Sequence, residues 1–129
     1  MKRPQQQHKL AITFLYVRDL PRAMAFYEDI LGLELTIDQG WAKIYQIVGA
    51  AHVGLVDETR GMNNWSDTKS VQLCIRVGNV AEWYAYATAI NLDDLSELRE
   101  NETLGIRAFV FRDPEGYQIE IQSALRDGA

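Results

Sequence analysis

VRDLPRAMAFYEDILGLEL, residues 17–35, is the stretch of sequence that decides the fold of this chain. Asp19 is a good helix N-cap, and Pro21 falls in the first helical turn, where its missing N–H costs little. Apolar residues then recur at helical spacing, at Leu20, Ala23, Met24, Tyr27 and Leu31. Gly32 is placed to end the helix. The stretch therefore predicts the end of one strand, a capped helix and the start of another strand.

Strand-forming runs flank this helix on both sides. LAITFLYV, residues 10–17, precedes it, and short apolar runs follow it at residues 33–38, 41–48 and 52–57. Gly40 and the step at residues 49–50 separate these runs. Residues 10–57 are therefore predicted to form one βαβββ module.

The same order of elements returns in the second half of the chain. A polar segment without periodicity, residues 58–69, is predicted to be a linker. VQLCIRV, residues 71–77, then alternates like a strand with one buried face, and Asn79 with Glu82 predicts a capping box. The buried stripe of this second helix is expected at Val80, Trp83, Ala87 and Ile90. Because a shift of 60 residues superimposes the two strand-and-helix segments, the sequence indicates a duplicated unit.

The end of the chain completes the second module. Residues 91–105 are acidic and predict only a short strand or turn near Leu95. Residues 106–112 and 117–123 indicate a hairpin, whose turn at residues 113–116 has Pro second and Gly fourth, as in a type I turn. The second module thus covers residues 70–123, and residues 1–129 are predicted to form a single α+β domain with short tails.

Composition limits the classes of partner. The net charge of −5 argues against nucleic acid, because phosphate-backbone binding needs a concentrated Lys and Arg surface. The longest mostly apolar stretch, residues 47–56, contains His52 and is too short to span a bilayer. Residues 1–9 lack the apolar stretch of a secretory signal, and a single cysteine, Cys74, rules out an intrachain disulfide. We therefore expect a cytoplasmic protein with no membrane partner.

A second diagnostic stretch is FRDPEGYQIEIQ, residues 111–122. Together with residues 17–35, and placed around an internal repeat, it resembles the glyoxalase/bleomycin resistance protein/dioxygenase (vicinal oxygen chelate, VOC) superfamily over nearly the whole chain. The resemblance implies that the two βαβββ modules form an open, curled, mixed β-sheet around a cleft, with the helices on the convex side. It also implies a homodimer.

The resemblance further implies four metal-ligand positions, two in each module, at Ile12, Gly54, Gln72 and Glu120. Ile12 has no lone pair, Gly54 has no side chain, and Gln72 offers only a neutral amide oxygen. A catalytic divalent site usually has about three protein ligands, and Glu120 alone is an ordinary one. We therefore predict no metal cofactor. The alternative is a displaced divalent metal held by Glu120 with Gln72 or His52.

Strand alternation predicts the residues that line the cleft, since alternate side chains share one face of a sheet. The second module offers a polar set and the first a largely apolar one, with Trp65 in the linker belonging to neither. The predicted ligand-binding residues are Phe14, Tyr16, His52, Trp65, Gln72, Cys74, Arg76, Gln118 and Glu120. Trp65 has three open placements: over the cleft, against a second subunit, or in the core.

Each candidate also has a purely structural interpretation. Glu120 would form an internal ion pair with Arg76, His52 would be an exposed strand histidine, and Cys74 an inert small apolar residue. Phe14 and Tyr16 would fill the core. The acidic residues at 93–102 would form a solvated face.

Three functions remain open from the sequence. The leading hypothesis is metal-independent binding or sequestering of a small organic ligand, which needs a cleft and no chemistry. The alternative is an enzyme, a lyase, isomerase or dioxygenase, in which catalytic Glu120 is a metal ligand or a general base. The third is a dimerising or regulatory module.

Overall fold

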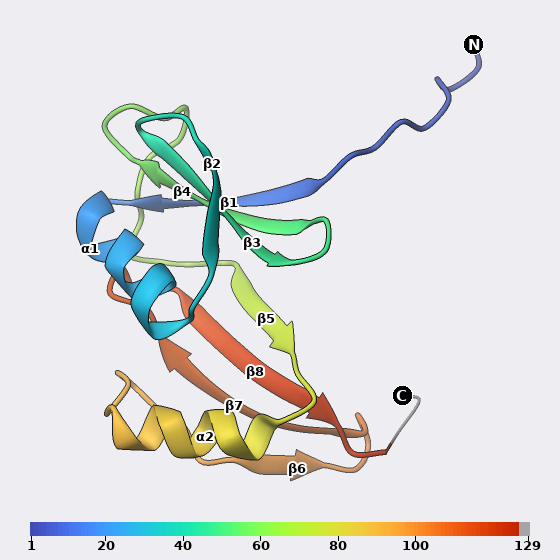
Figure 1. Cartoon of the computed structure of the whole chain (residues 1–129), viewed down its shortest axis with the longest axis vertical. Coiled ribbons are helices and arrows are strands. Elements are labelled where there is room, and N and C mark those ends of the chain that lie inside the picture. The colour runs from blue at the N-terminus through green and yellow to red at the C-terminus, as the bar shows by residue number, and fades with distance from the viewer. Residues whose placement is uncertain (127–129) are drawn as a thin grey trace. The chain divides into compact units, whose positions relative to one another are not determined.

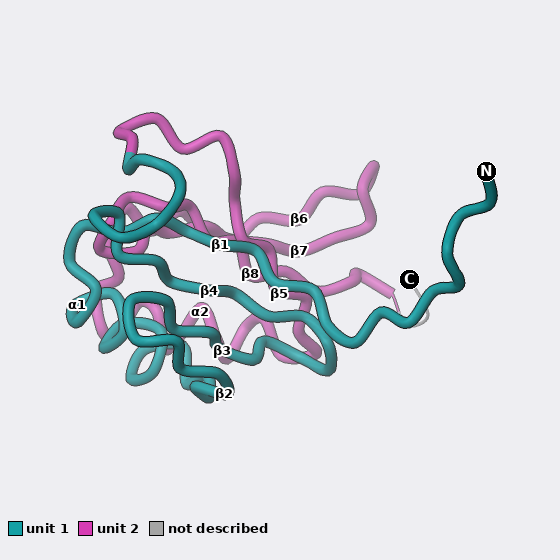
Figure 2. The backbone as a smooth tube through the Cα atoms, turned by 90° about the horizontal axis from the view of Figure 1, so that it is seen from above, with its two compact units in different colours: residues 1–65 teal, residues 66–129 magenta. Residues whose placement is uncertain are grey.

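Two compact units make up the chain in a computed structural model, Met1–Trp65 (unit 1) and Ser66–Ala129 (unit 2) (Figure 2). The structure describes residues 1–126. The boundary between the units falls inside the segment 58–69 that the sequence predicts to be a linker. Within residues 1–126, no helix is both long enough and apolar enough to cross a membrane.

Unit 1 contains a four-stranded mixed sheet and one helical segment (Figure 1). Its elements are β1 (Ala11–Val17), α1 (Leu20–Ala25), η1 (Phe26–Ile30), β2 (Glu34–Asp38), β3 (Ala42–Val48) and β4 (Ala51–Asp57). The strand order is β1-β4-β3-β2, with β1 and β4 parallel and the other pairs antiparallel. Strand β4 is therefore central, with a neighbour on each side.

Unit 2 repeats this topology with β5 in the place of β1. Its elements are β5 (Gln72–Arg76), α2 (Val80–Ala89), β6 (Arg99–Asn101), β7 (Ile106–Arg112) and β8 (Gln118–Ala124). The strand order is β5-β8-β7-β6, and β5 and β8 are the parallel pair. Two mixed four-stranded sheets, each with its own helix, confirm the predicted α+β class and the two βαβββ modules.

The first helix begins and ends where the sequence predicts. Asp19 Oδ1 accepts a hydrogen bond from the Arg22 N–H at 3.1 Å, and Gly32 follows the helix with a φ of 71°. From Phe26 onward the helix widens into the π-helical turn η1, in which the Leu31 N–H donates to the Phe26 carbonyl at 3.1 Å. This wider turn buries the adjacent aromatic residues Phe26 and Tyr27 together.

Three details of unit 2 differ from the sequence predictions. The predicted capping box is incomplete, because Asn79 Nδ2 donates to the Glu82 carboxylate at 2.9 Å instead of the Asn79 side chain capping a backbone N–H. Of the predicted stripe on α2, Ile90 is exposed and Trp83 only half-buried. The short strand lies at Arg99–Asn101, past Leu95, and all its residues are exposed. As an edge strand paired only with β7, β6 needs no apolar alternation.

Each helix packs on one face of its own sheet. In unit 1, the ring of Tyr27 lies 6.4 Å from that of Tyr45 on β3, and both residues are fully buried. In unit 2, the ring of Tyr84 on α2 lies 5.1 Å from that of Phe109 on β7. These contacts fix which face of each sheet is the core. The opposite face is left for the candidate site.

The turn between β7 and β8 forms as predicted. The Gly116 N–H donates to the Asp113 carbonyl at 3.1 Å, and Asp113 Oδ1 accepts from the Glu115 and Tyr117 N–H groups at 2.9 Å each. Asp113 is buried, so its carboxylate is satisfied by backbone donors inside the turn.

Candidate functional site

The register of each sheet arranges the side chains of its open face in rows. In unit 1 the rows are Ile12–His52–Gln46, Phe14–Gly54–Ile44 and Tyr16–Val56–Ala42, each crossing β1, β4 and β3. In unit 2 they are Gln72–Gln118–Arg112, Cys74–Glu120–Val110 and Arg76–Gln122–Ala108, crossing β5, β8 and β7. The predicted difference between an apolar first module and a polar second module therefore holds in the second and third rows, whereas the first row of unit 1 contains His52 and Gln46.

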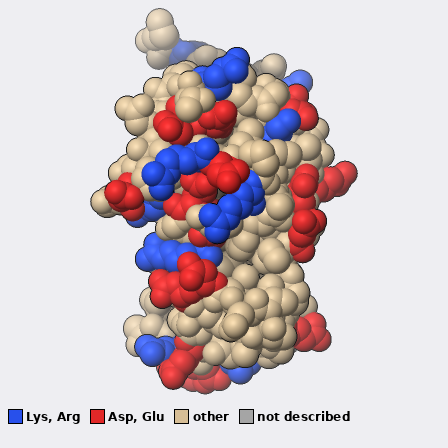
Figure 3. Space-filling view, turned by 90° about the vertical axis from the view of Figure 1, so that its left-hand side faces the viewer, with Lys and Arg blue, Asp and Glu red and all other residues tan. Residues whose placement is uncertain are grey.

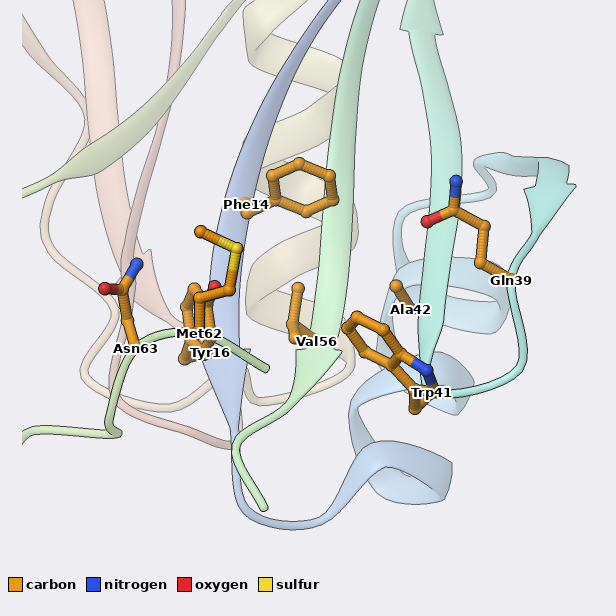
Figure 4. Close-up of a pocket in the computed structure, with 8 residues that line it drawn as sticks. All are labelled: Phe14, Tyr16, Gln39, Trp41, Ala42, Val56, Met62 and Asn63. Atoms are coloured by element: carbon orange, nitrogen blue, oxygen red, sulfur yellow. The ribbon is translucent and has the colours of Figure 1, made fainter. Parts of the chain in front are cut away.

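A pocket of about 370 Å³ lies on the open face of unit 1 (Figure 4). Its lining is Phe14, Tyr16, Gln39, Trp41, Ala42, Val56, Met62 and Asn63, none of them charged. Figure 4 shows Trp41 and Gln39 on one side of the pocket and Met62, Asn63 and Tyr16 on the other, with Val56 between them. Two predicted site residues, Phe14 and Tyr16, thus line the pocket.

The loop that carries Trp41 is fixed by hydrogen bonds around it. Asp38 Oδ1 accepts from Lys43 Nζ at 2.7 Å and from the Gly40 N–H at 2.8 Å, and these two bonds hold the pKa of Asp38 below its usual value. The Trp41 carbonyl accepts from the Asp57 N–H at 2.9 Å. The loop between β2 and β3 therefore presents the indole at a defined place beside the pocket.

The segment after β4 closes the opposite side. Asp57 Oδ1 accepts from Thr59 Oγ1 at 2.8 Å and from the Thr59 N–H at 3.0 Å, and these bonds lower the pKa of Asp57. A Cβ at Gly61 would lie 2.5 Å from Tyr16 and 2.6 Å from Val56. Only glycine lets the segment approach the sheet this closely, and this approach brings Met62 and Asn63 to the pocket.

The Phe14 ring packs over a second glycine, Gly54, on the open face of unit 1. A Cβ at Gly54 would lie 2.6 Å from Phe14 Cδ1 and 3.2 Å from Ile12 Cγ2. The space that a side chain at position 54 would take is therefore filled by the Phe14 ring, whose other side is exposed. The result is a flat aromatic wall next to the pocket.

A hydrogen-bonded polar network covers the open face of unit 2. Gln118 Nε2 donates to Gln72 Oε1 at 3.0 Å, and Gln72 Nε2 donates to Glu120 Oε1 at 3.5 Å. Gln122 Nε2 donates to Glu120 Oε2 at 2.5 Å, and Arg76 Nε donates to Gln122 Oε1 at 2.8 Å. Glu120 is the acceptor at the centre of the network. Gln122 thus links Arg76 to Glu120 through hydrogen bonds.

Cys74 lies beside the same carboxylate. Its Sγ is 3.6 Å from Glu120 Oε2, and partial burial together with the negative charge of Glu120 raises the pKa of the thiol. The thiol therefore stays protonated near neutral pH, which disfavours a nucleophilic role because the thiolate is the reactive form.

Two predicted site residues, His52 and Trp65, lie outside the lining of the unit 1 pocket. His52 is 8% exposed, and its Nδ1 lies 3.0 Å from the Ala50 carbonyl oxygen, so the expectation of an exposed strand histidine is wrong. His52 lies between Ile12 and Gln46 in the first row of the open face. The half-buried Trp65 packs against Arg18, whose Cζ lies 3.5 Å from the ring centroid, and it is not part of the lining of the pocket in Figure 4.

Several residues of the site are not among those predicted from the sequence. Gln39, Trp41, Met62 and Asn63 lie in loops that carry no periodic signal, so alternation could not find them. Gln122, which shares a row of the open face of unit 2 with Arg76, is not among the predicted site residues. The large aromatic Trp41 next to Gly40 was the one available signal.

Charge gives no further site on the face shown in Figure 3. Acidic and basic side chains are interspersed there, without a surface of a single sign.

Comparison with known proteins identifies the family. The sequence profile of the glyoxalase/bleomycin resistance protein/dioxygenase superfamily matches residues 9–121. The chain belongs to this superfamily. No curated protein matches the chain by sequence.

Solved structures of low sequence identity share the superfamily fold. A lactoylglutathione lyase from Agrobacterium tumefaciens aligns with a TM-score of 0.73 at 21% identity, covering 98% of this chain and 100% of its own. TioX from Micromonospora sp. ML1 aligns with a TM-score of 0.74 at 19% identity, covering 91% and 99%. The fosfomycin resistance protein FosX from Listeria monocytogenes aligns with a TM-score of 0.72 at 16% identity, covering 92% and 95%. At these identities the likeness shows the fold alone.

The donor set of this chain does not fit the metal site that the superfamily implies. In unit 1, Ile12 and Gly54 supply no donor atom, and the Phe14 ring fills the space beside Gly54. In unit 2, Glu120 accepts a hydrogen bond from Gln72. Within the described residues 1–126, no three His, Cys, Asp or Glu side chains cluster closely enough to hold a metal ion.

Proposed function

We propose that this superfamily member binds a small, uncharged, aromatic organic molecule in the pocket of unit 1, without a metal ion. The observation that carries the proposal is a cavity of about 370 Å³ whose lining includes three aromatic residues and no charged residue. Ligand sites in proteins are typically apolar cavities of roughly 300–1,000 Å³ with a few polar groups.

The lining supplies both kinds of contact that such a ligand needs. Phe14, Tyr16 and Trp41 offer aromatic surface, and aromatic pairs contribute about 0.5–1.5 kcal/mol beyond the burial of their area. The amides of Gln39 and Asn63 offer donors and acceptors that would fix the orientation of the ligand. Met62 is almost fully exposed, so a ligand would also bury its flexible side chain.

Binding is tested by titrating neutral bicyclic aromatic compounds into the protein and following thermal stability and tryptophan fluorescence. We expect stabilisation that is lost in Trp41→Ala and kept in Leu104→Ala. Both residues are large exposed apolar residues, but Leu104 lies outside the pocket. Equal binding by wild type and Trp41→Ala would overturn the proposal.

An enzymatic role is the second candidate. Glu120 supports it, since Gln72, Cys74 and Gln122 orient this carboxylate on the open face of unit 2. Glu120 would then act as a general base toward a proton next to a carbonyl. Substrate turnover that is abolished in Glu120→Gln would favour this role over binding alone.

A homodimer and a cytoplasmic location complete the proposal. The homodimer follows from the resemblance to the superfamily, and a two-fold pair is the commonest assembly of soluble proteins. Sedimentation equilibrium over a range of concentrations measures the mass, and a monomer throughout would remove the dimer from the proposal.

A further inference from the structure

A second cavity, of about 380 Å³, lies on unit 2 and belongs to neither function above. It is lined by Lys69, Ser70, Val71, Gln72, Arg112 and Gln118. The floor is one complete row of the sheet, Gln72–Gln118–Arg112, at the end where β5 and β8 begin and β7 ends. Lys69 and Ser70 come from the segment that leads into β5.

The charged groups of this lining all have the same sign. Lys69 and Arg112 are cationic, and no carboxylate lines the cavity among the described residues. In a chain with a net charge of −5, a cavity with two cations and no acid stands apart from the average surface. The matching row of unit 1, Ile12–His52–Gln46, contains no Lys or Arg. The feature is therefore specific to the second half of the duplication.

Both cations are held in place by other contacts. Lys69 Nζ donates to the Ser66 carbonyl and lies 4.6 Å from the centroid of the Tyr117 ring. Arg112 Nη1 donates to the Gly116 carbonyl at 3.0 Å, and Nε donates to Asp94 Oδ2 at 3.4 Å. These bonds use Nε and Nη1, and leave the N–H groups of Nη2 for a ligand.

Neighbouring acids limit the strength of the site. Asp94 does not line the cavity, but its Oδ2 lies 3.4 Å from Arg112 Nε and offsets part of the charge of Arg112. Glu120 lies one row further along β8 and is 3.5 Å from Gln72 Nε2. Binding of a lone anion is therefore expected in the millimolar range.

We propose that this cavity binds a small oxyanion, the phosphate or carboxylate group of a ligand. Lys69 provides charge, Arg112 provides N–H groups from Nη2, and the Ser70 hydroxyl provides a neutral donor. Charge-assisted hydrogen bonds from cations to an oxyanion are stronger than neutral ones. The proposal does not depend on ligand binding in unit 1.

The test titrates inorganic phosphate and, separately, acetate into the full chain at constant ionic strength set with chloride, and follows amide proton–nitrogen spectra. We expect saturable shifts at the backbone amides of Ser70 and Val71 and at the side-chain amides of Gln72 and Gln118. The anion that saturates at the lower concentration identifies the preferred group. Signals of the Trp41 indole should not move, which separates this site from the pocket of unit 1.

Lys69→Gln should raise the Kd of the anion about tenfold, which is the effect of losing one charged hydrogen-bond donor. Arg99→Gln is the matched control, because it also removes one cation but from an exposed pair with Glu97 outside the cavity. Ser70→Ala should weaken binding without any change in charge. Shifts that do not saturate, or equal weakening by Lys69→Gln and Arg99→Gln, would overturn the site in favour of general surface attraction.

Discussion

The Phe14 ring lies directly over Gly54, on the strand paired with its own. A Cβ at position 54 would be 2.6 Å from Phe14 Cδ1. The superfamily resemblance assigns a metal ligand to position 54, and in this chain an aromatic ring takes the place of that ligand. The packing of Phe14 over Gly54 therefore both makes this face of unit 1 apolar and leaves position 54 without a metal donor.

The first prediction tests this contact. Gly54→Ala should lower the free energy of unfolding by about 1 kcal/mol, at the low end of overpacking costs, because the half-exposed Phe14 ring can swing outward. In a Phe14→Ala background the same change should cost less, since the clash is gone. Urea denaturation of the four proteins measures the coupling. Equal costs in both backgrounds would show that the contact does not exist.

Gly61→Ala should be more damaging than Gly54→Ala. Its Cβ would meet Tyr16 and also Val56, which is 2% exposed and cannot move away freely. We expect a loss of about 1–3 kcal/mol and weaker ligand binding, because Met62 and Asn63 would move with the segment. Gly78→Ala is the matched control, since a Cβ there meets nothing within 4 Å. Gly61→Ala as mild as this control would be inconsistent with the close approach.

Tyr45 should resist ionisation while the protein is folded. Burial first, and then the charge and hydrogen bond of Glu28 at 3.2 Å, raise the pKa of Tyr45 well above the usual 10.0. With the folded pKa raised, this contribution to stability is complete below about pH 10 and is lost as the pH rises further. An ultraviolet titration of the native protein should show fewer ionising tyrosines than the six in the chain, with Tyr45 among those that do not ionise. Tyr45→Phe should leave the native titration unchanged; if it removes a tyrosine that ionises normally, this assignment is wrong.

Cys74 should react slowly with alkylating reagents. Partial burial and Glu120 raise the pKa of its thiol, so the thiolate fraction at pH 8 falls below that of a free thiol. Glu120→Gln removes the negative charge and should speed alkylation several-fold. The rates are followed by intact-mass spectrometry. A wild-type rate equal to that of glutathione would argue against this environment.

The sequence was sufficient for elements that depend on local signals. Asp19, Gly32 and the turn at Asp113 act through their own backbone neighbourhood, and each occurs where it was predicted. The internal repeat predicted that the two units share one topology, and equivalent strands do pair in equivalent register in the two units. Alternation placed Phe14 and Tyr16 on the open face correctly.

Features that depend on tertiary position were not predictable. His52 looks like an exposed strand residue until its neighbours in the sheet, Ile12 and Gln46, are known. Trp41 and Met62 reach the pocket only because two loops converge there, and loops have no periodicity. Trp65 could be placed only once Arg18 was found under its ring.

The most direct test of the central claim, metal-free binding in unit 1, is calorimetric titration of the best neutral aromatic ligand. The protein is first stripped with a chelator and then, in a parallel sample, supplied with divalent metal. We predict the same Kd in both samples, and loss of binding in Trp41→Ala. Binding that appears only after metal is restored, and disappears in Glu120→Gln, would contradict the account.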